Sequence, residues 1–170
     1  RLFDTAGVAV STEARAATFA DHLASIQWRV RHVTLTPDTE PAIDSEMHVD
    51  LKPFGHCELR KAIFSLKSGK SIRQGDIPVE VFKVFAETAG AALQQLLDLF
   101  NQCLQKREVP QDWLTARVTL IYKNGNPAFC DNYRPICMTT VAYKIYATML
   151  KNRLLQAGVE DKIWKSQFGF

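Results

Sequence analysis

The 170-residue sequence has few of the features that mark a membrane, secreted or zinc-binding protein. Its apolar runs are only a few residues long, so no segment is expected to span a bilayer. No basic-then-apolar leader opens the sequence, and no signal peptide is visible. The four cysteines form no C-x-x-C pair, and the four histidines are not spaced with them as zinc ligands. Reduced thiols and an intracellular location, in the nucleus or cytoplasm, are therefore expected.

Residues that would carry catalysis are also scarce. No two Asp or Glu residues have the spacing of a two-metal site, and Asp76, Asp112 and Asp131 resemble turn or cap residues. The segment 68–71, Ser-Gly-Lys-Ser, ends like a phosphate-binding P-loop. Position 64 is Phe where that motif needs Gly, and the preceding segment has a helical period. The sequence therefore predicts no catalytic residue and no metal ligand.

The composition is that of a globular domain, with 46% hydrophobic and 23% charged residues. The net charge of +3 is unevenly distributed along the chain. It is −4 over residues 1–50, +2 over residues 51–100 and +5 over residues 101–170. A chain that becomes basic toward its end indicates a polyanionic partner there, although a solvated basic surface would give the same count.

Hydrophobic spacing predicts a mainly helical α+β fold. An amphipathic helix is expected over 11–30, capped by Ser11 or Thr12, followed by an irregular connector over 34–56. Helices with one apolar face are then expected from His56 to near Gly69, after Pro78, ahead of Pro110 and over about 140–157. The apolar faces consist of Phe19, Leu23, Ile26 and Val30; Leu59, Ala62, Ile63 and Leu66; Val81, Phe82 and Phe85; Leu93, Leu96, Leu97, Phe100 and Leu104; and Val141, Ile145, Met149 and Leu150 or Leu154.

The hydrophobic period changes from about 3.6 to 2 at residues 117–122, which predicts a strand. Asn124-Gly125 supplies a tight turn, and the chain is expected to return through 132–136 as the second arm of a hairpin. Such a hairpin would bring Lys123 near Arg134. Two cations presented together suit a triphosphate, although both could equally be solvated loop residues.

These segments, taken in order, resemble the reverse transcriptase domain of non-LTR (LINE-type) retrotransposons. The most specific pieces are Asn-Tyr-Arg-Pro-Ile, a Lys-x-Gly about ten residues before it, and Gln-x-Gly-Phe at the far end. The segments that carry the resemblance are Leu66-Lys67-Ser68-Gly69-Lys70, Asp76-Ile77-Pro78-Val79-Glu80, Val109-Pro110-Gln111-Asp112-Trp113, Ile121-Tyr122-Lys123-Asn124-Gly125, Asn132-Tyr133-Arg134-Pro135-Ile136, Tyr143-Lys144-Ile145, Arg153-Leu154 and Gln167-Phe168-Gly169-Phe170.

The resemblance covers residues 56–170 and implies the N-terminal portion of that domain, truncated. The implied fold is a partial right-hand polymerase: fingers with a β-hairpin, and the start of the palm. Residues 1–55 would be a connector with one amphipathic helix. Lys123 and Arg134 match positions expected to contact the phosphates of the incoming nucleotide. Further nucleic-acid contacts are expected at Lys70, Asn132, Lys144, Lys151, Arg153 and Gln167.

Two departures from the family pattern stand out. Arg73 occupies the place of a glycine, and Gly75 the place of an aspartate, in the loop near Lys70. In addition, the chain stops at Phe170, before the aspartates that hold Mg²⁺ in the family's palm. The parent would be an RNA-directed DNA polymerase that uses an RNA template, a DNA primer, deoxynucleotides and Mg²⁺. This stretch alone, without the rest of the palm and the thumb, is expected to bind no metal and to be inactive.

Two other interpretations fit the same sequence. The chain could be a stand-alone nucleic-acid-binding module that uses a basic surface formed by Lys123, Arg134, Lys144, Lys151 and Arg153. It could also be a non-functional remnant of a retroelement, with hydrophobic surfaces left bare.

Overall fold

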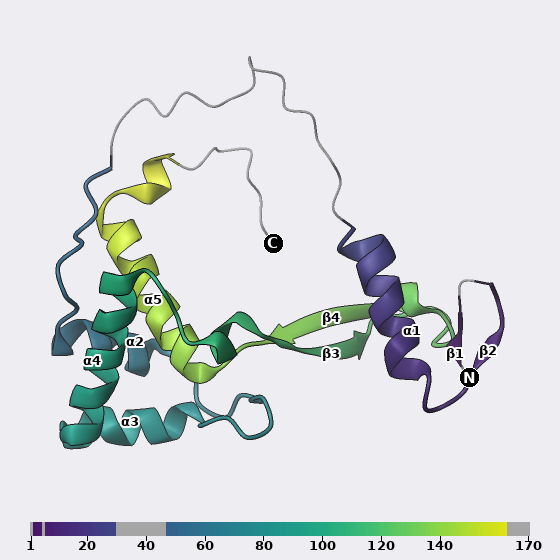
Figure 1. Cartoon of the computed structure of the whole chain (residues 1–170), viewed down its shortest axis with the longest axis horizontal. Helices are drawn as coiled ribbons and strands as arrows, with labels where there is room; N and C mark the ends of the chain where they lie inside the picture. The colour runs from purple at the N-terminus through teal and green to yellow at the C-terminus, as the bar shows by residue number, and fades with distance from the viewer. Residues whose placement is uncertain (1, 5, 30–46, 163–170) are drawn as a thin grey trace, which may run out of the picture. The chain divides into compact units, whose positions relative to one another are not determined.

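A computed structural model describes residues 2–4, 6–29 and 47–162 (Figure 1). The described residues divide into two compact units. Residues 2–29 and 118–137 form one, called the hairpin unit below, and residues 47–117 and 138–162 form the other, called the helical unit. The N-terminal segment thus packs with the hairpin, while the predicted domain boundary after residue 55 stays a prediction.

The helical unit contains four α-helices, which are the helices expected beyond residue 55, and two short 3₁₀ turns that were not predicted. They are α2 (His56–Ser65), α3 (Val79–Thr88), α4 (Ala91–Lys106), the 3₁₀ turn η3 (Gln111–Leu114), α5 (Val141–Gln156) and the 3₁₀ turn η5 (Val159–Lys162). Local chemistry explains several boundaries. The Thr140 hydroxyl accepts the Tyr143 N–H and caps α5, and α3 begins directly after Pro78.

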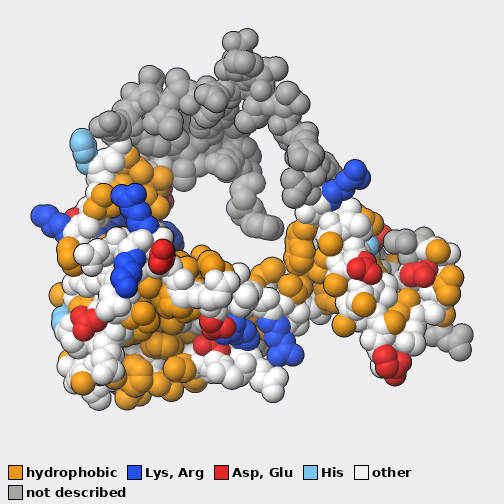
Figure 2. All heavy atoms as spheres, viewed as in Figure 1, with side chains coloured by type: hydrophobic (Ala, Val, Ile, Leu, Met, Phe, Trp, Pro, Cys, Tyr) orange, Lys and Arg blue, Asp and Glu red, His pale blue; other side chains and the backbone are white. Residues whose placement is uncertain are grey.

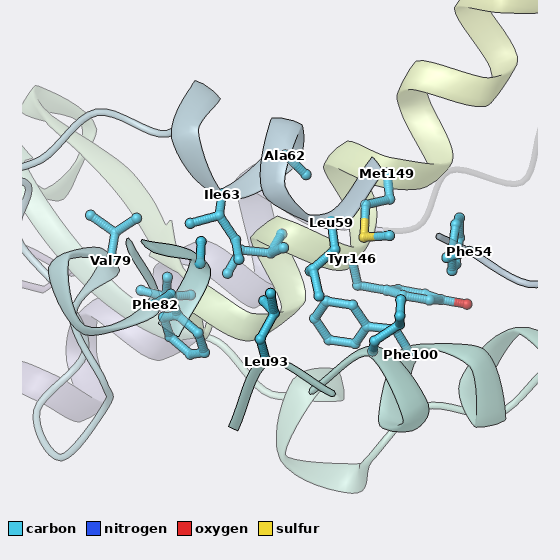
Figure 3. Packing of buried hydrophobic residues seen from close by; sticks show 14 of the residues in the cluster. Phe54, Leu59, Ala62, Ile63, Val79, Phe82, Leu93, Phe100, Tyr146 and Met149 are labelled. Atoms are coloured by element: carbon cyan, nitrogen blue, oxygen red, sulfur yellow. The ribbon is translucent and has the colours of Figure 1, made fainter. Parts of the chain in front are cut away.

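One hydrophobic core holds these helices together (Figure 3). Phe100 lies at its centre, fully buried, with its ring 5.8 Å from that of Trp113 and 5.5 Å from that of Tyr146. The predicted faces of α2, α4 and α5 are confirmed in the main: Leu59, Ala62, Ile63, Leu93, Leu97, Phe100, Val141, Ile145 and Met149 are all buried. These large side chains, spaced at three and four residues, are what a helix must bury to be stable in water.

On two helices the structure refines the predicted face: one residue is wrong on α3, and one of two alternatives is selected on α5. On α3, Val81 is exposed, while Val79, Phe82 and Ala86 point into the core at helical spacing. On α5, Leu150 packs against the core and Leu154 is exposed. The helix predicted to reach Gly69 ends at Ser65, because Leu66 is already extended, with φ −79° and ψ 134°.

The hairpin unit combines two small antiparallel ribbons with one helix. A short ribbon pairs β1 (Leu2–Phe3) with β2 (Ala9–Val10), in the register Leu2 opposite Val10. The helix α1 (Arg15–His22) follows and runs into a π-helical turn, η1 (Leu23–Gln27). The longer ribbon pairs β3 (Arg117–Tyr122) with β4 (Tyr133–Met138), and the 3₁₀ turn η4 (Cys130–Asn132) precedes β4 (Figure 1).

The N-terminal helix is shorter than predicted. Ser11 accepts the Ala14 N–H in a turn that precedes α1, so it does not cap the helix itself. The π turn, closed by a 2.7 Å hydrogen bond from the Trp28 N–H to the Leu23 carbonyl, explains why Ile26 is 51% exposed. A π turn holds more residues than an α turn, so Ile26 rotates away from the buried face. Val30 and most of the predicted connector, 34–46, lie outside the described residues.

The predicted α+β class is confirmed, since helices dominate and two small antiparallel sheets accompany them. Among the described helices, none combines the length and the apolar character needed to cross a membrane.

Candidate functional site

The hairpin of β3 and β4 presents Lys123 and Arg134 on the same face. The Lys123 N–H donates to the Asn132 carbonyl at 2.8 Å, and the rings of Tyr122 and Tyr133 lie 5.6 Å apart. Both observations place Lys123 opposite Asn132 and Tyr122 opposite Tyr133. Side chains alternate along a strand, so in this register Arg134 is a diagonal neighbour of Lys123, on the side away from the two tyrosines.

The two faces of this hairpin differ in exposure. Phe19 of α1 packs edge-on against Tyr133, at 4.9 Å between ring centroids, and so covers part of the tyrosine face. On the other face Ile121 is 52% exposed, and Lys123, Arg134 and Ile136 are exposed too. We call Thr119, Ile121, Lys123, Arg134 and Ile136 the cation face. It contains two positive charges and no carboxylate, which is an arrangement suited to an anionic ligand.

Hydrogen bonds within the turn hold Lys123 in place. Its ammonium group donates to the Asp131 carbonyl at 3.3 Å. The Asn132 side-chain amide donates to the Asn126 carbonyl at 2.7 Å and lies against Gly125. Gly125 has φ +89°, and a Cβ added there would lie 2.9 Å from the Asn132 amide nitrogen. Position 125 therefore requires glycine both for its positive φ and because a Cβ would collide with Asn132. The Asn132 side chain is used to hold the turn together.

A second group of cations lies in the helical unit. Lys67 and Lys70, from the loop after α2, and Lys144, from the first turn of α5, line a small cleft of about 130 Å³. Its other lining residues are Leu66, Ser71, Ile72, Val79 and Val141. We call this the lysine cleft. A lining that combines three lysines with apolar side chains suits a phosphate joined to a less polar group.

Three residues shape the loop that supplies Lys70. They are Arg73 and Gly75, which depart from the family pattern, and Asp76. Arg73 donates to the Asp112 carboxylate, which lowers the pKa of Asp112 and raises that of Arg73. The Asp76 carboxylate accepts the Val141 N–H at 2.9 Å and so ties the loop to the start of α5. Gly75 has φ +84°, a conformation that favours glycine. Asp76 and Asp112 thus shape the loop, as expected of turn or cap residues.

The prediction for Arg153 needs correction, because its guanidinium faces the interior of the helical unit. The side chain is only 4% exposed and makes two hydrogen bonds to Glu58, at 2.7 and 3.0 Å. It also donates to the carbonyls of Asp50, Lys52 and Pro53, and lies 4.2 Å from the centre of the Phe54 ring. These contacts occupy the group, so Arg153 is a structural residue. Sequence spacing missed this role, since its partners lie about 95 to 103 residues away.

The remaining predicted contacts are placed as follows. Lys151 is exposed on α5, and Gln167 lies outside the described residues. Within residues 2–4, 6–29 and 47–162, no three His, Cys, Asp or Glu side chains are grouped as metal ligands. The described residues therefore do not fit the Mg²⁺ site of a polymerase.

Comparison with known proteins gives two curated relatives, while no family model matches the chain. The chain is 28% identical, over 170 aligned residues, to a "Probable RNA-directed DNA polymerase from transposon BS" of Drosophila melanogaster. It is also 28% identical, over 97 residues, to a "Transposon TX1 uncharacterized 149 kDa protein" of Xenopus laevis. The alignments cover 96% and 57% of this chain.

The chain spans only 18% of the Drosophila protein and 7% of the Xenopus protein. Both relatives are transposon proteins, and one carries the name of the activity that the motifs predict. Alignment and motifs thus agree, and they confirm that this chain resembles part of the reverse transcriptases of non-LTR retrotransposons.

Proposed function

We propose that this chain is part of an RNA-directed DNA polymerase of a transposon, and that it forms fingers and the start of a palm. The observation that carries the proposal is the cation face of the hairpin. There Lys123 and Arg134, the two residues that match nucleotide-contacting positions of the family, lie on one exposed face. The proposed ligand of this face is the triphosphate of the incoming deoxynucleotide.

The chemistry of the two side chains supports this role. A guanidinium presents parallel N–H groups that match two phosphate oxygens, and an ammonium is a compact charge that neutralises a third. Lys123 is steadied by its bond to the Asp131 carbonyl, and the turn behind it is fixed by Gly125 and Asn132. The face binds and orients a substrate; phosphoryl transfer needs carboxylates and metal ions that we assign to the rest of the polymerase.

The lysine cleft of the helical unit supports a second contact, to the backbone of a template strand. Lys67, Lys70 and Lys144 converge there from two elements, and Lys151 is exposed further along α5. Contacts to phosphates position a strand without reading its sequence, so this surface would accept any template.

The nucleotide proposal is tested by titrating the 170-residue protein with a fluorescent deoxynucleoside triphosphate. Lys123→Ala and Arg134→Ala each remove one charge-assisted contact and should weaken binding about tenfold. Lys61→Ala is the matched control, because Lys61 is exposed on α2, outside both cationic surfaces. Equal affinity of all three variants and the unaltered chain would contradict the proposal.

A primer-extension assay tests the claim that this stretch binds without catalysing. We expect no synthesis from the 170 residues on an RNA template with Mg²⁺ and all four deoxynucleotides. Robust synthesis that stops when EDTA is added would overturn this expectation.

The lysine cleft also favours the alternative of a stand-alone nucleic-acid-binding module. Filter binding to a single-stranded RNA across a salt series tests the phosphate contacts on which this alternative depends, since phosphate-driven affinity falls steeply with salt. A module should bind RNA tightly at low salt and lose affinity in Lys70→Ala/Lys144→Ala. Absence of RNA binding at low salt would remove this alternative. A remnant would be poorly soluble, so a monomer that melts cooperatively argues against that interpretation.

A further inference from the structure

The hairpin unit contains a second, chemically opposite site. A cleft of about 590 Å³ lies between the short ribbon, α1 and the loop that leads into β4. It is lined by Phe3, Asp4, Gly7, Thr18, Asp21, His22, Ser25, Phe129, Cys130 and Asp131. We call it the acidic cleft. None of these residues belongs to the cation face, and in the function proposed above only the backbone carbonyl of Asp131 takes part, as the acceptor of the Lys123 ammonium group.

The charges of this cleft are all of one sign. Asp4, Asp21 and Asp131 line it, and no Lys or Arg is among its lining residues. Its two hydroxyl groups are already used as donors, Ser25 to the Asp21 carbonyl at 2.6 Å and Thr18 to the Ala14 carbonyl at 3.0 Å. Acidic side chains also stand out over the α1 part of the molecule on the face drawn in Figure 2. The cleft therefore offers acceptors and repels phosphates.

A buried imidazole completes the set of acceptors. His22 is 5% exposed, and its Nε2 atom lies 3.3 Å from an Asp131 carboxylate oxygen. The two atoms are close, but they are not aligned as a hydrogen bond, and Nε2 has no hydrogen-bond partner among the described residues. Buried polar atoms are nearly always paired in native proteins, so an unpaired one in a cleft wall points to a ligand. With the imidazole proton on Nδ1, Nε2 is an acceptor, and a ligand with several N–H groups would satisfy Nε2 and the carboxylate together.

Aromatic rings form part of the same wall. Phe3 and Phe129 both line the cleft, with ring centroids 6.4 Å apart and planes tilted by 36°. The face of a benzene ring attracts a cation, and its apolar surface packs against a hydrocarbon stem. Carboxylates, an unpaired nitrogen and phenyl rings together match a cation on an apolar stem.

We propose that the acidic cleft binds the side chain of an arginine in a peptide segment of a protein partner. The planar guanidinium has five N–H groups and reaches several acceptors at once, while the three methylene groups of the side chain pack against the phenyl rings. A lysine side chain has the hydrocarbon stem but not the planar set of five N–H groups, and a metal ion has no stem. The hairpin unit then carries one surface for anions and another for a basic protein segment, so it joins a protein partner to the polymerase without using the nucleotide site.

The test titrates the full 170-residue protein with the peptide acetyl-Gly-Arg-Gly-amide. Binding is measured by calorimetry or by the shifts of backbone amide NMR signals. The matched peptide with citrulline keeps the shape and removes the charge. We expect saturable binding of the arginine peptide, at least about tenfold weaker binding of the citrulline peptide, and signal shifts confined to the cleft residues. This comparison needs no variant and does not depend on how a variant folds.

Variants then locate the site. Asp21→Asn/Asp131→Asn should weaken the arginine peptide about tenfold or more, and His22→Gln should weaken it less. Glu13→Gln is the control, because Glu13 is an exposed carboxylate near α1 that does not line the cleft.

Equal binding of both peptides, or full binding by the double variant, would overturn the proposal. So would displacement of the peptide by equimolar Mg²⁺ or spermidine, since the cleft would then be a site for small cations. Nucleotide binding at the cation face is measured separately, and its loss would leave this site intact.

Discussion

The helical unit and the hairpin unit are stabilised in different ways. All six of the largest fully buried side chains, Phe100, Leu59, Ile63, Leu93, Ile145 and Met149, belong to the helical unit. The buried apolar residues of the hairpin unit are Leu2, Leu23, Ala128 and Cys130, none of them aromatic. Its aromatic contacts, such as Phe19 on Tyr133, involve half-buried rings. Burial of apolar area is the main stabilising term in folding, so most of the stability resides in the helical unit.

The two units also differ in how several of their polar side chains are bound. In the helical unit, Arg153, Glu58 and Asp76 are bound to other parts of the same unit. In the hairpin unit, Lys123 and Arg134 are exposed, and His22 has an unpaired nitrogen. Exposed cations and unpaired polar atoms are available to a ligand, so the less stable unit holds the proposed nucleotide surface and the acidic cleft, while the lysine cleft lies in the helical unit. Ligand-binding regions are commonly of low local stability, held by a more rigid scaffold.

Phe100→Ala should give the largest effect. It removes a fully buried ring that packs against Trp113 and Tyr146, and leaves a cavity in the helical unit. We expect the free energy of unfolding to fall by about 4 kcal/mol, measured by urea unfolding followed by tryptophan fluorescence. The matched variant in the hairpin unit is Phe19→Ala, with an expected loss of about 1 kcal/mol. Equal losses at the two sites would abolish the proposed contrast between the units.

Arg153→Ala should give the next largest effect. It leaves the Glu58 carboxylate and three backbone carbonyls without their donor. Removing one partner of a buried pair costs about 3 kcal/mol or more, and urea unfolding measures it. Lys151→Ala is the control, two residues earlier on the same helix and exposed. If both variants were equally stable, Arg153 would return to the set of candidate nucleic-acid contacts.

Gly125→Ala tests the hairpin unit alone. An alanine there must adopt φ +89°, and its Cβ collides with the Asn132 amide, which shares the turn with Lys123. We expect a loss of about 1 to 2 kcal/mol, confined to the hairpin unit, together with weaker nucleotide binding. Hydrogen exchange of backbone amides separates the units: protection should fall in β3 and β4 and stay unchanged in α4. Gly90→Ala is the control, because a Cβ added there meets no other atom and its φ is negative.

Sequence reasoning predicted local structure better than long-range contacts. The helices of the helical unit, the strand over 117–122 and the turn at Gly125 follow from hydrophobic period and backbone preference, which act over a few residues. The burial of Arg153 does not, since its partners are far away in the chain. The π turn of η1 was missed for a different reason: its sequence, Leu-Ala-Ser-Ile-Gln, has an ordinary helical pattern.

The candidate site shows the same division. Lys123 and Arg134 were found because one strand, one turn and one family motif involve neighbouring residues. The acidic cleft was missed, because Asp4, Asp21 and Asp131 look like separate surface acids until β1, α1 and the loop before β4 are folded together. No short motif marks such a site, so only the packed unit can show it.

The smallest expected effect concerns pH and the helical unit. The hydrogen bond from Arg153, and a weaker one from the Gly55 N–H, hold the pKa of Glu58 below its usual 4.5, against the opposing effect of burial. A carboxylate with a lower pKa in the folded state contributes stability that is fully present above the unfolded pKa and is lost as the pH falls through the folded pKa. Urea unfolding between about pH 6 and about pH 3.5 should therefore show a steeper loss of stability for the unaltered chain than for Glu58→Gln. The difference should be modest, since Glu58 is 36% exposed and water screens the pair.

Glu87→Gln is the control, because Glu87 is an exposed carboxylate on α3, and this variant should keep the full slope. Equal slopes in the two variants would mean that Arg153 is held by the backbone carbonyls and the Phe54 ring, with no part for the charge of Glu58.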